Sequence, residues 1–100
     1  ERPEIVKQFR ERLAGMDRAS LGHAVDAVMF GRTDIRSQIH RITVPTLVVC
    51  GEDDLATPLA RSIDIQSRIQ GSKLVRIPNA GHLSAWEQPG VVNAALSAFL

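Results

Sequence analysis

The chain has 100 residues, enough for one domain at most, and a formal net charge of +1. Hydrophobic residues make up 44% and charged residues 23%, which is ordinary for a globular protein. The basic residues are scattered, so no Lys and Arg run predicts a nucleic-acid partner or a membrane-binding face. No apolar stretch approaches the roughly 20 residues that span a bilayer.

Signals for compartment and targeting are few. Cys50 is the single cysteine, so no intrachain disulfide can form, which is compatible with a reducing compartment. The first residues lack the apolar segment of a signal peptide, and the chain has no initiating Met. We therefore expect a cytoplasmic protein, and we expect the 100 residues to begin inside a longer chain.

The first third of the chain is predicted to be helical. Pro3 suits a first helical turn and Gly15 suits a helix end, and the apolar positions between them recur every four residues: Ile5, Phe9 and Leu13. A second helix can be capped by Asp17 or Ser20 and closed by Gly31, with apolar positions at Leu21, Ala24, Val25, Val28 and Met29. A third, short helix is expected to start near Asp34, with apolar positions at Ile35, Ile39 and Ile42.

A change of pattern at Pro45 predicts the first strand, over residues 44–50. Within it, residues 46–50 form a continuous apolar, mostly β-branched run that stops at Gly51. Such a run is typical of a strand buried on both faces, as in a parallel sheet covered by helices. A second strand is predicted over residues 73–77, where Pro78 stops it.

Each predicted strand is followed by a predicted helix. Thr57 as N-cap and Pro58 at the first helical position begin one helix, which ends at Gly71. A last helix begins at Pro89, with apolar positions at Val91, Val92, Ala95, Leu96 and Phe99. A strand, a crossover helix and a parallel strand make a βαβ unit, which is almost always right-handed.

Polar residues follow both strands at the edge where such sheets carry their chemistry. Residues 51–54 follow the first strand and residues 79–82 follow the second. Because the carboxyl ends of parallel neighbours share one edge, Asp54 and His82 are predicted to face each other across a 28-residue separation. An Asp paired with a His fixes the tautomer of the ring and stabilises the imidazolium, which is the acid-and-base half of a nucleophile triad.

These segments resemble the α/β-hydrolase family. Residues 44–54 resemble its penultimate strand and acid loop, with an apolar run, a Gly, two residues and then Asp, and Pro58 stands four residues after Asp54. Gly81-His82 with Glu87 and Pro89 resembles the family's Gly-His-(four residues)-Glu-x-Pro motif. The resemblance implies an α/β fold, in which residues 34–100 form the C-terminal βαβα part of the sheet and residues 1–33 are the end of a helical cap.

The resemblance also implies an activity. It identifies Asp54 as the catalytic acid and His82 as the catalytic base of acyl transfer on a small-molecule ester or lactone, without a cofactor, and it is most similar to 3-oxoadipate enol-lactonases and related small-ester hydrolases. The family's Gly-x-Ser-x-Gly nucleophile elbow is absent, since Ser20-Leu21-Gly22 has Arg18 where the first Gly should stand. We therefore expect this chain alone to be inactive.

Several alternatives stay open. The fold also carries non-catalytic binding or signalling proteins, dehalogenases, epoxide hydrolases, C–C bond hydrolases and haloperoxidases. Asp53 competes with Asp54 for the role of acid, although its spacing to Gly51 fits less well. The remaining candidates are interpreted as structural or solvent-facing: Glu52, His23, His40, Cys50, Ser84 as a helix-start residue, and Trp86 as either a packing residue or a pocket residue. No histidine stands at a metal-ligand spacing.

The strand at 44–50 also generates an expectation about association. In the family this strand pairs on both sides, and only one partner strand is predicted in this chain. An uncharged, unpaired strand edge invites pairing with another chain. We expect either a symmetric dimer, in which two such strands meet antiparallel in a four-stranded sheet, or association with a missing N-terminal part.

Overall fold

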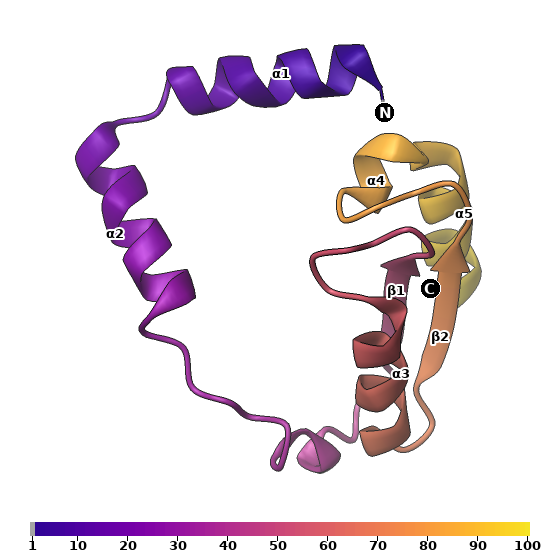
Figure 1. Cartoon of the computed structure of the whole chain (residues 1–100). Helices are drawn as coiled ribbons and strands as arrows, with labels where there is room; N and C mark the ends of the chain where they lie inside the picture. Colours follow the sequence, from indigo (N-terminus) through magenta and orange to yellow (C-terminus); the bar gives the residue numbers. More distant parts are fainter. Residues whose placement is uncertain (1) are drawn as a thin grey trace. The chain divides into compact units, whose positions relative to one another are not determined.

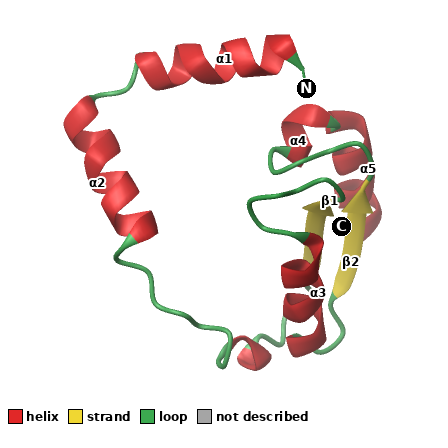
Figure 2. Cartoon of the chain, in the orientation of Figure 1, coloured by secondary structure: helices red, strands yellow, loops and turns green. Residues whose placement is uncertain are grey.

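The computed structural model describes residues 2–100, which form two units that we treat separately, one up to residue 34 and one over residues 35–100 (Figures 1 and 2). The first unit contains helices α1 (Pro3–Ala14) and α2 (Arg18–Met29). The second contains a 3₁₀ turn η1 (Ile39–Arg41), strands β1 (Leu47–Gly51) and β2 (Lys73–Ile77), and helices α3 (Leu59–Arg68), α4 (Ser84–Glu87) and α5 (Pro89–Phe99). The α/β class is thus confirmed.

The two predicted helices of the first unit are present. Pro3 is the first residue of α1, where its missing N–H costs nothing, and Gly15 caps the other end. The Asp17 side chain accepts a hydrogen bond from Ser20 N at 2.9 Å, so Asp17 is the N-cap of α2. The helix ends at Met29 with Phe30 as its C-cap, and Gly31 follows the cap directly, the position where glycine commonly closes a helix, as predicted.

The third predicted helix is wrong. Only Ile39–Arg41 is helical, as a single 3₁₀ turn, and residues 36–38 form a hydrogen-bonded turn. A helix this short is stable only when its apolar face is packed. Ile35 is 57% exposed and Ile42 is 37% exposed, while Ile39 is partly buried, so the three isoleucines that predicted the helix do not share one buried face.

The βαβ unit is confirmed in its order and direction. Strand β1 pairs in parallel with β2, and Leu47 stands opposite Lys73 while Gly51 stands opposite Ile77. Helix α3 connects the two strands and packs against both, and α5 packs against β2 (Figure 1). The first strand is shorter than predicted, since it begins at Leu47 and extends to Gly51.

The ends of α3 differ from the prediction. Its N-cap is Pro58 and not Thr57, and it ends at Arg68, three residues before Gly71. Pro58 has an extended ψ of 154°, so the helix cannot start before Leu59. Gly71 makes the turn into β2 with a positive φ of 77°, a conformation that suits glycine.

A small apolar core lies beside the second strand. Ile77, Ala80 and Val92 are its buried members, and Val49 and Val75 pack against them from the adjacent strand positions. Val92 comes from α5, which begins at Pro89 as predicted. The expectation that the first strand is buried on both faces is wrong for this chain, because residues 47–49 are only half-buried. Among residues 2–100 the sheet has two strands, so β1 has a neighbouring strand on one side only.

None of the helices in residues 2–100 is both long and apolar enough to cross a membrane.

The expected association through the first strand stays a prediction. In the first unit, the apolar positions Val25 and Val28 of α2 are 48% and 52% exposed.

Gly51, the last residue of β1, lies against the backbone of the segment that follows β2. A Cβ atom at this position would collide with the carbonyl oxygens of Ala80 and Gly81 and would stand 2.8 Å from the carbonyl carbon of Ala80. Only glycine therefore allows the end of β1 to lie against the segment that carries His82.

We predict that Gly51→Ala destabilises the chain by about 1–3 kcal/mol, because the backbone of residues 80–81 must move to admit the methyl group. The free energy of unfolding from urea denaturation measures this. Gly22→Ala is the matched control: nothing lies within 4 Å of its added Cβ. In the interior of α2 this change should stabilise by about 0.5–1 kcal/mol. Equal effects of the two substitutions would contradict the proposed close approach.

Candidate active site

Two loops meet beyond the carboxyl ends of the parallel strands. The N–H of Glu52 donates to the carbonyl of Ile77 and the N–H of Asp53 donates to the carbonyl of Ala80, both at 2.9 Å. Asn79 has a positive φ of 54° and turns the chain at the end of β2, a conformation that Asn tolerates better than most residues. These backbone hydrogen bonds hold the loop after β1 against the end of β2 and the segment that follows it.

Asp54 lies at the centre of this junction and is only 8% exposed. Its Oδ1 accepts a hydrogen bond from the backbone N–H of Thr57 at 2.9 Å, and its Oδ2 accepts one from the Thr57 hydroxyl at 2.9 Å. The same Oδ2 lies 3.0 Å from Nδ1 of His82. The predicted meeting of Asp54 and His82 across the strand ends is therefore confirmed as geometry.

The surroundings of Asp54 decide its charge. Burial alone would raise the pKa of the carboxyl, but the Thr57 N–H, the His82 ring and the Thr57 hydroxyl all favour the carboxylate. Together they lower its pKa from 3.8 to about 2. Asp54 is therefore an anion throughout the neutral range and accepts hydrogen bonds without donating any.

This charge state determines the tautomer of His82. A carboxylate can only accept, so the 3.0 Å contact requires a proton on Nδ1 of the ring. In the neutral ring Nε2 is then the unprotonated nitrogen, which can take a proton from another group. The His82 side chain is 57% exposed, and its Nε2 makes no hydrogen bond to the described residues. The arrangement is that of a general base held by a buried acid.

The backbone just before His82 is held by the glutamate of the predicted motif. Glu87, in α4, accepts a hydrogen bond at Oε2 from the N–H of Gly81 at 2.8 Å. A Cβ on Gly81 would lie 3.4 Å from this oxygen, an ordinary van der Waals distance. Ser84 begins α4, as its interpretation as a helix-start residue predicts.

The other candidates do not join this pair. Asp53 and Glu52 are exposed, and Asp53 contributes its backbone N–H to the loop junction. Cys50 is buried inside β1, with its Sγ 3.3 Å from the Gly51 carbonyl, as expected of a packing residue. His23 lies in α2 and His40 in η1. Among residues 2–100, no three His, Cys, Asp or Glu side chains cluster as a metal site would require.

Thr57 is the site residue that the sequence interpretation missed, because the Thr-Pro pair resembles a helix start. The structure gives its hydroxyl to Asp54 and places it 3.2 Å from Nδ1 of His82. A signal was present: Asp and Thr residues readily bond to nearby backbone, and Thr57 stands three residues after Asp54, as in a local Asp-to-backbone turn.

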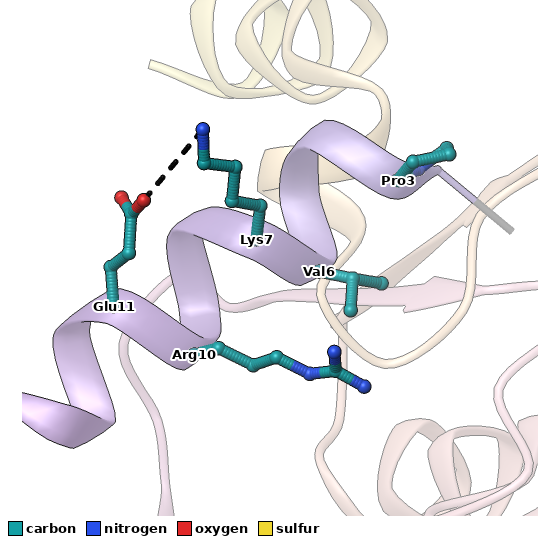
Figure 3. A pocket seen from close by; sticks show the side chains of 5 residues that line it. All are labelled: Pro3, Val6, Lys7, Arg10 and Glu11. Atoms are coloured by element: carbon teal, nitrogen blue, oxygen red, sulfur yellow. Dashed lines mark ion pairs between the residues drawn. The ribbon is translucent and has the colours of Figure 1, made fainter.

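A hollow on α1 is unrelated to this site (Figure 3). Its lining residues all belong to one helix: Pro3, Val6, Lys7, Arg10 and Glu11. Lys7 and Glu11 form an exposed ion pair at 3.9 Å, which contributes little to stability. A single helix surface provides no opposing wall, so we assign no function to this hollow.

Comparison with known proteins agrees with the geometry. The family described as "alpha/beta hydrolase fold" matches residues 8–89, most of the chain. The chain belongs to this family. The resemblance carried by the two loop motifs is thereby confirmed at the level of the family.

Two curated proteins are similar to the chain over most of its length. The chain is 33% identical over 98 residues to 3-oxoadipate enol-lactonase 2 of Acinetobacter baylyi, covering 98% of the chain and 36% of that protein. It is 36% identical over 83 residues to a putative non-heme chloroperoxidase of Synechocystis, covering 82% of the chain and 30% of that protein.

A solved structure extends the match to three dimensions. A hydrolase from Pseudomonas aeruginosa PA01 superposes with a TM-score of 0.84 at 36% identity, covering 98% of this chain and 36% of that one. The chain therefore spans about a third of the length of these three proteins.

We predict that the stability of the chain falls as the pH drops from about 4 to about 2. The unfolded state binds a proton on Asp54 near pH 3.8 and the folded state only near pH 2, so acid favours unfolding in this window. The contribution, about 2 kcal/mol, is almost complete by about pH 5 and is lost mainly between about pH 4 and about pH 2. Urea denaturation at several pH values measures it. Asp54→Asn should reduce the dependence of the free energy of unfolding on pH in this window. Asp53→Asn leaves the Asp54 carboxyl in place and should not reduce it.

Proposed function

We propose that this chain supplies the acid and the base of a hydrolase that cleaves an ester or a lactone by acyl transfer. The observation that carries the proposal is the contact between the buried Asp54 carboxylate and Nδ1 of His82 at 3.0 Å, which leaves Nε2 of an exposed ring as the proton acceptor. Membership of the α/β-hydrolase family supports it. In this proposal residues 1–33 belong to the end of a helical cap and residues 34–100 to the catalytic core.

The pair suits both halves of acyl transfer. In the first half, Nε2 of His82 takes the proton of a nucleophilic side chain as that side chain attacks the carbonyl carbon, and Asp54 stabilises the resulting imidazolium. His82 then protonates the leaving oxygen. In the second half, His82 takes a proton from water as the water oxygen attacks the acyl carbon. The bond between that carbon and the nucleophile then breaks, the carboxylic acid leaves, and His82 returns its proton to the nucleophile. Asp54 stays ionised throughout and keeps the ring in one orientation.

The nucleophile and the oxyanion donors lie outside these 100 residues in this proposal. The chain has no Gly-x-Ser-x-Gly elbow, and its cysteine is buried within β1. In the family the nucleophile precedes the acid and the histidine along the chain, which is consistent with a nucleophile located before residue 1.

The named relatives support two substrate classes. The enol-lactonase supports a lactone or a small ester, the substrate that we favour. The chloroperoxidase supports a second candidate, peroxide-dependent halogenation on the same acid–histidine pair. An assay of the complete protein separates them: lactone or ester hydrolysis without peroxide supports the first, and activity that requires both halide and peroxide supports the second.

We predict that Asp54→Asn in the complete protein lowers turnover about 10⁴-fold while the fold is kept, because the amide favours the wrong tautomer of His82. Steady-state hydrolysis of a small lactone measures the loss. Asp53→Asn is the matched control and should cost far less, since the Asp53 side chain is exposed and its backbone N–H survives the change. The reverse order of the two effects would make Asp53 the acid.

We also predict that the isolated 100-residue chain hydrolyses an activated ester no faster than background. It offers a base but neither a nucleophile nor oxyanion donors, which supply the covalent step and most of the electrostatic stabilisation. The measurement is the release of a chromophore from a small ester. A saturable rate that disappears in His82→Ala would reveal a nucleophile within this chain.

A further inference from the structure

The Thr57 hydroxyl touches both members of the acid–histidine pair. Its Oγ1 lies 2.9 Å from Oδ2 of Asp54 and 3.2 Å from Nδ1 of His82, and these two atoms are 3.0 Å from each other. Three polar atoms of three residues therefore form a closed triangle in which every side has hydrogen-bonding length.

The available protons determine how this triangle is bonded. The hydroxyl has one proton, which it donates to Oδ2 of Asp54. Its remaining contact, to Nδ1 of His82, then has the oxygen as acceptor and the ring N–H as donor. The N–H of Nδ1 is thus shared between Oδ2 at 3.0 Å and Oγ1 at 3.2 Å. Both acceptors demand the same tautomer of His82.

We propose that Thr57 is a positioning residue for the acyl transfer described above, acting through its hydroxyl to hold the carboxylate of Asp54 and the ring of His82 in one arrangement. The inference rests on the proposed function. Thr57 touches neither the substrate nor the transferred proton on Nε2; it restricts the two residues that do the chemistry.

The local chain makes the hydroxyl well placed for this role. Pro58 biases the residue before it toward extended backbone, and a β-branched Thr side chain has few rotamers. The backbone N–H of Thr57 donates a hydrogen bond to Oδ1 of Asp54, which holds the Thr57 backbone in place. The hydroxyl of the same residue donates to Oδ2 of the same carboxylate. The carboxylate is held at both oxygens by one residue, and rotation about its terminal bond is restricted.

Removal of the Thr57 hydroxyl removes two of the contacts that hold the acid–histidine pair. In Thr57→Val the backbone N–H and the branched shape are kept, so Oδ1 retains its donor, while Oδ2 loses one donor and Nδ1 loses its second acceptor. The carboxylate and the exposed ring then sample more orientations, of which fewer are productive. Thr57→Ser keeps the hydroxyl and should retain the arrangement.

The experiment compares variants of the complete protein in lactone hydrolysis. Thr57→Val should lower kcat about 3- to 10-fold with KM unchanged, the size expected for one such hydrogen bond. Thr57→Ser should restore kcat to within about 2-fold of the unmodified protein, on the same basis. Thr46→Val is the matched control, because its hydroxyl bonds only locally, to the carbonyl of Val44 at 2.9 Å, and its kcat should stay unchanged.

A spectroscopic readout separates positioning from a general loss of structure. The ¹⁵N chemical shifts of the His82 ring report which nitrogen carries the proton. At a pH where the ring is neutral, Thr57→Val should increase the share of the tautomer protonated at Nε2, and Thr57→Ser should not.

Three results would overturn the inference: an unchanged kcat and ring tautomer in Thr57→Val, a loss in Thr57→Ser equal to that in Thr57→Val, or an equal loss in Thr46→Val. His82→Ala tells this failure apart from failure of the proposed function. If His82→Ala is inactive and Thr57→Val behaves as the unmodified protein, only the role of Thr57 is wrong. If His82→Ala stays active, the proposed function is wrong, and the inference fails with it.

Discussion

The arrangement of the site depends on the buried carboxylate of Asp54. A charge with 8% exposure is tolerated only when hydrogen-bond donors surround it, and in this site the donors are the N–H and hydroxyl of Thr57 and the ring of His82. The hydrogen bonds to this carboxylate fix the turn from residue 54 to residue 57. They also orient the imidazole of His82, which lies in the loop after β2. The chemistry that we propose and the local structure therefore have the same physical cause.

The parts of this arrangement that follow from backbone geometry could be predicted from the residues alone. An apolar run between Pro45 and Gly51 and a second run stopped by Pro78 predict two strands, and a single crossover helix makes them parallel. Parallel strands end at one edge, so Asp54 and His82 had to be neighbours once both followed strand ends. The bounds of β2 and the start of α5 agree with the prediction because proline acts locally.

The parts that depend on tertiary contacts could not be predicted in this way. Thr57 before Pro58 has the local features of a helix cap, and only the position of His82, 25 residues later, shows what its hydroxyl contacts. The isoleucines near residue 39 have helical spacing, but Ile35 and Ile42 are exposed and only Ile39 is partly buried. Burial of β1 on both faces is typical of a wider sheet, and residues 2–100 contain two strands.

The close approach of Gly51 to residues 80–81 has a consequence for how the pair assembles during folding. The chain between Asp54 and His82 is a loop of 28 residues, and closing such a loop has an entropic cost that grows with the logarithm of its length. The pairing of β1 with β2 and the two backbone hydrogen bonds beyond their ends close this same loop. The acid and the histidine therefore come together with little further loss of chain entropy, as soon as this one crossover has formed.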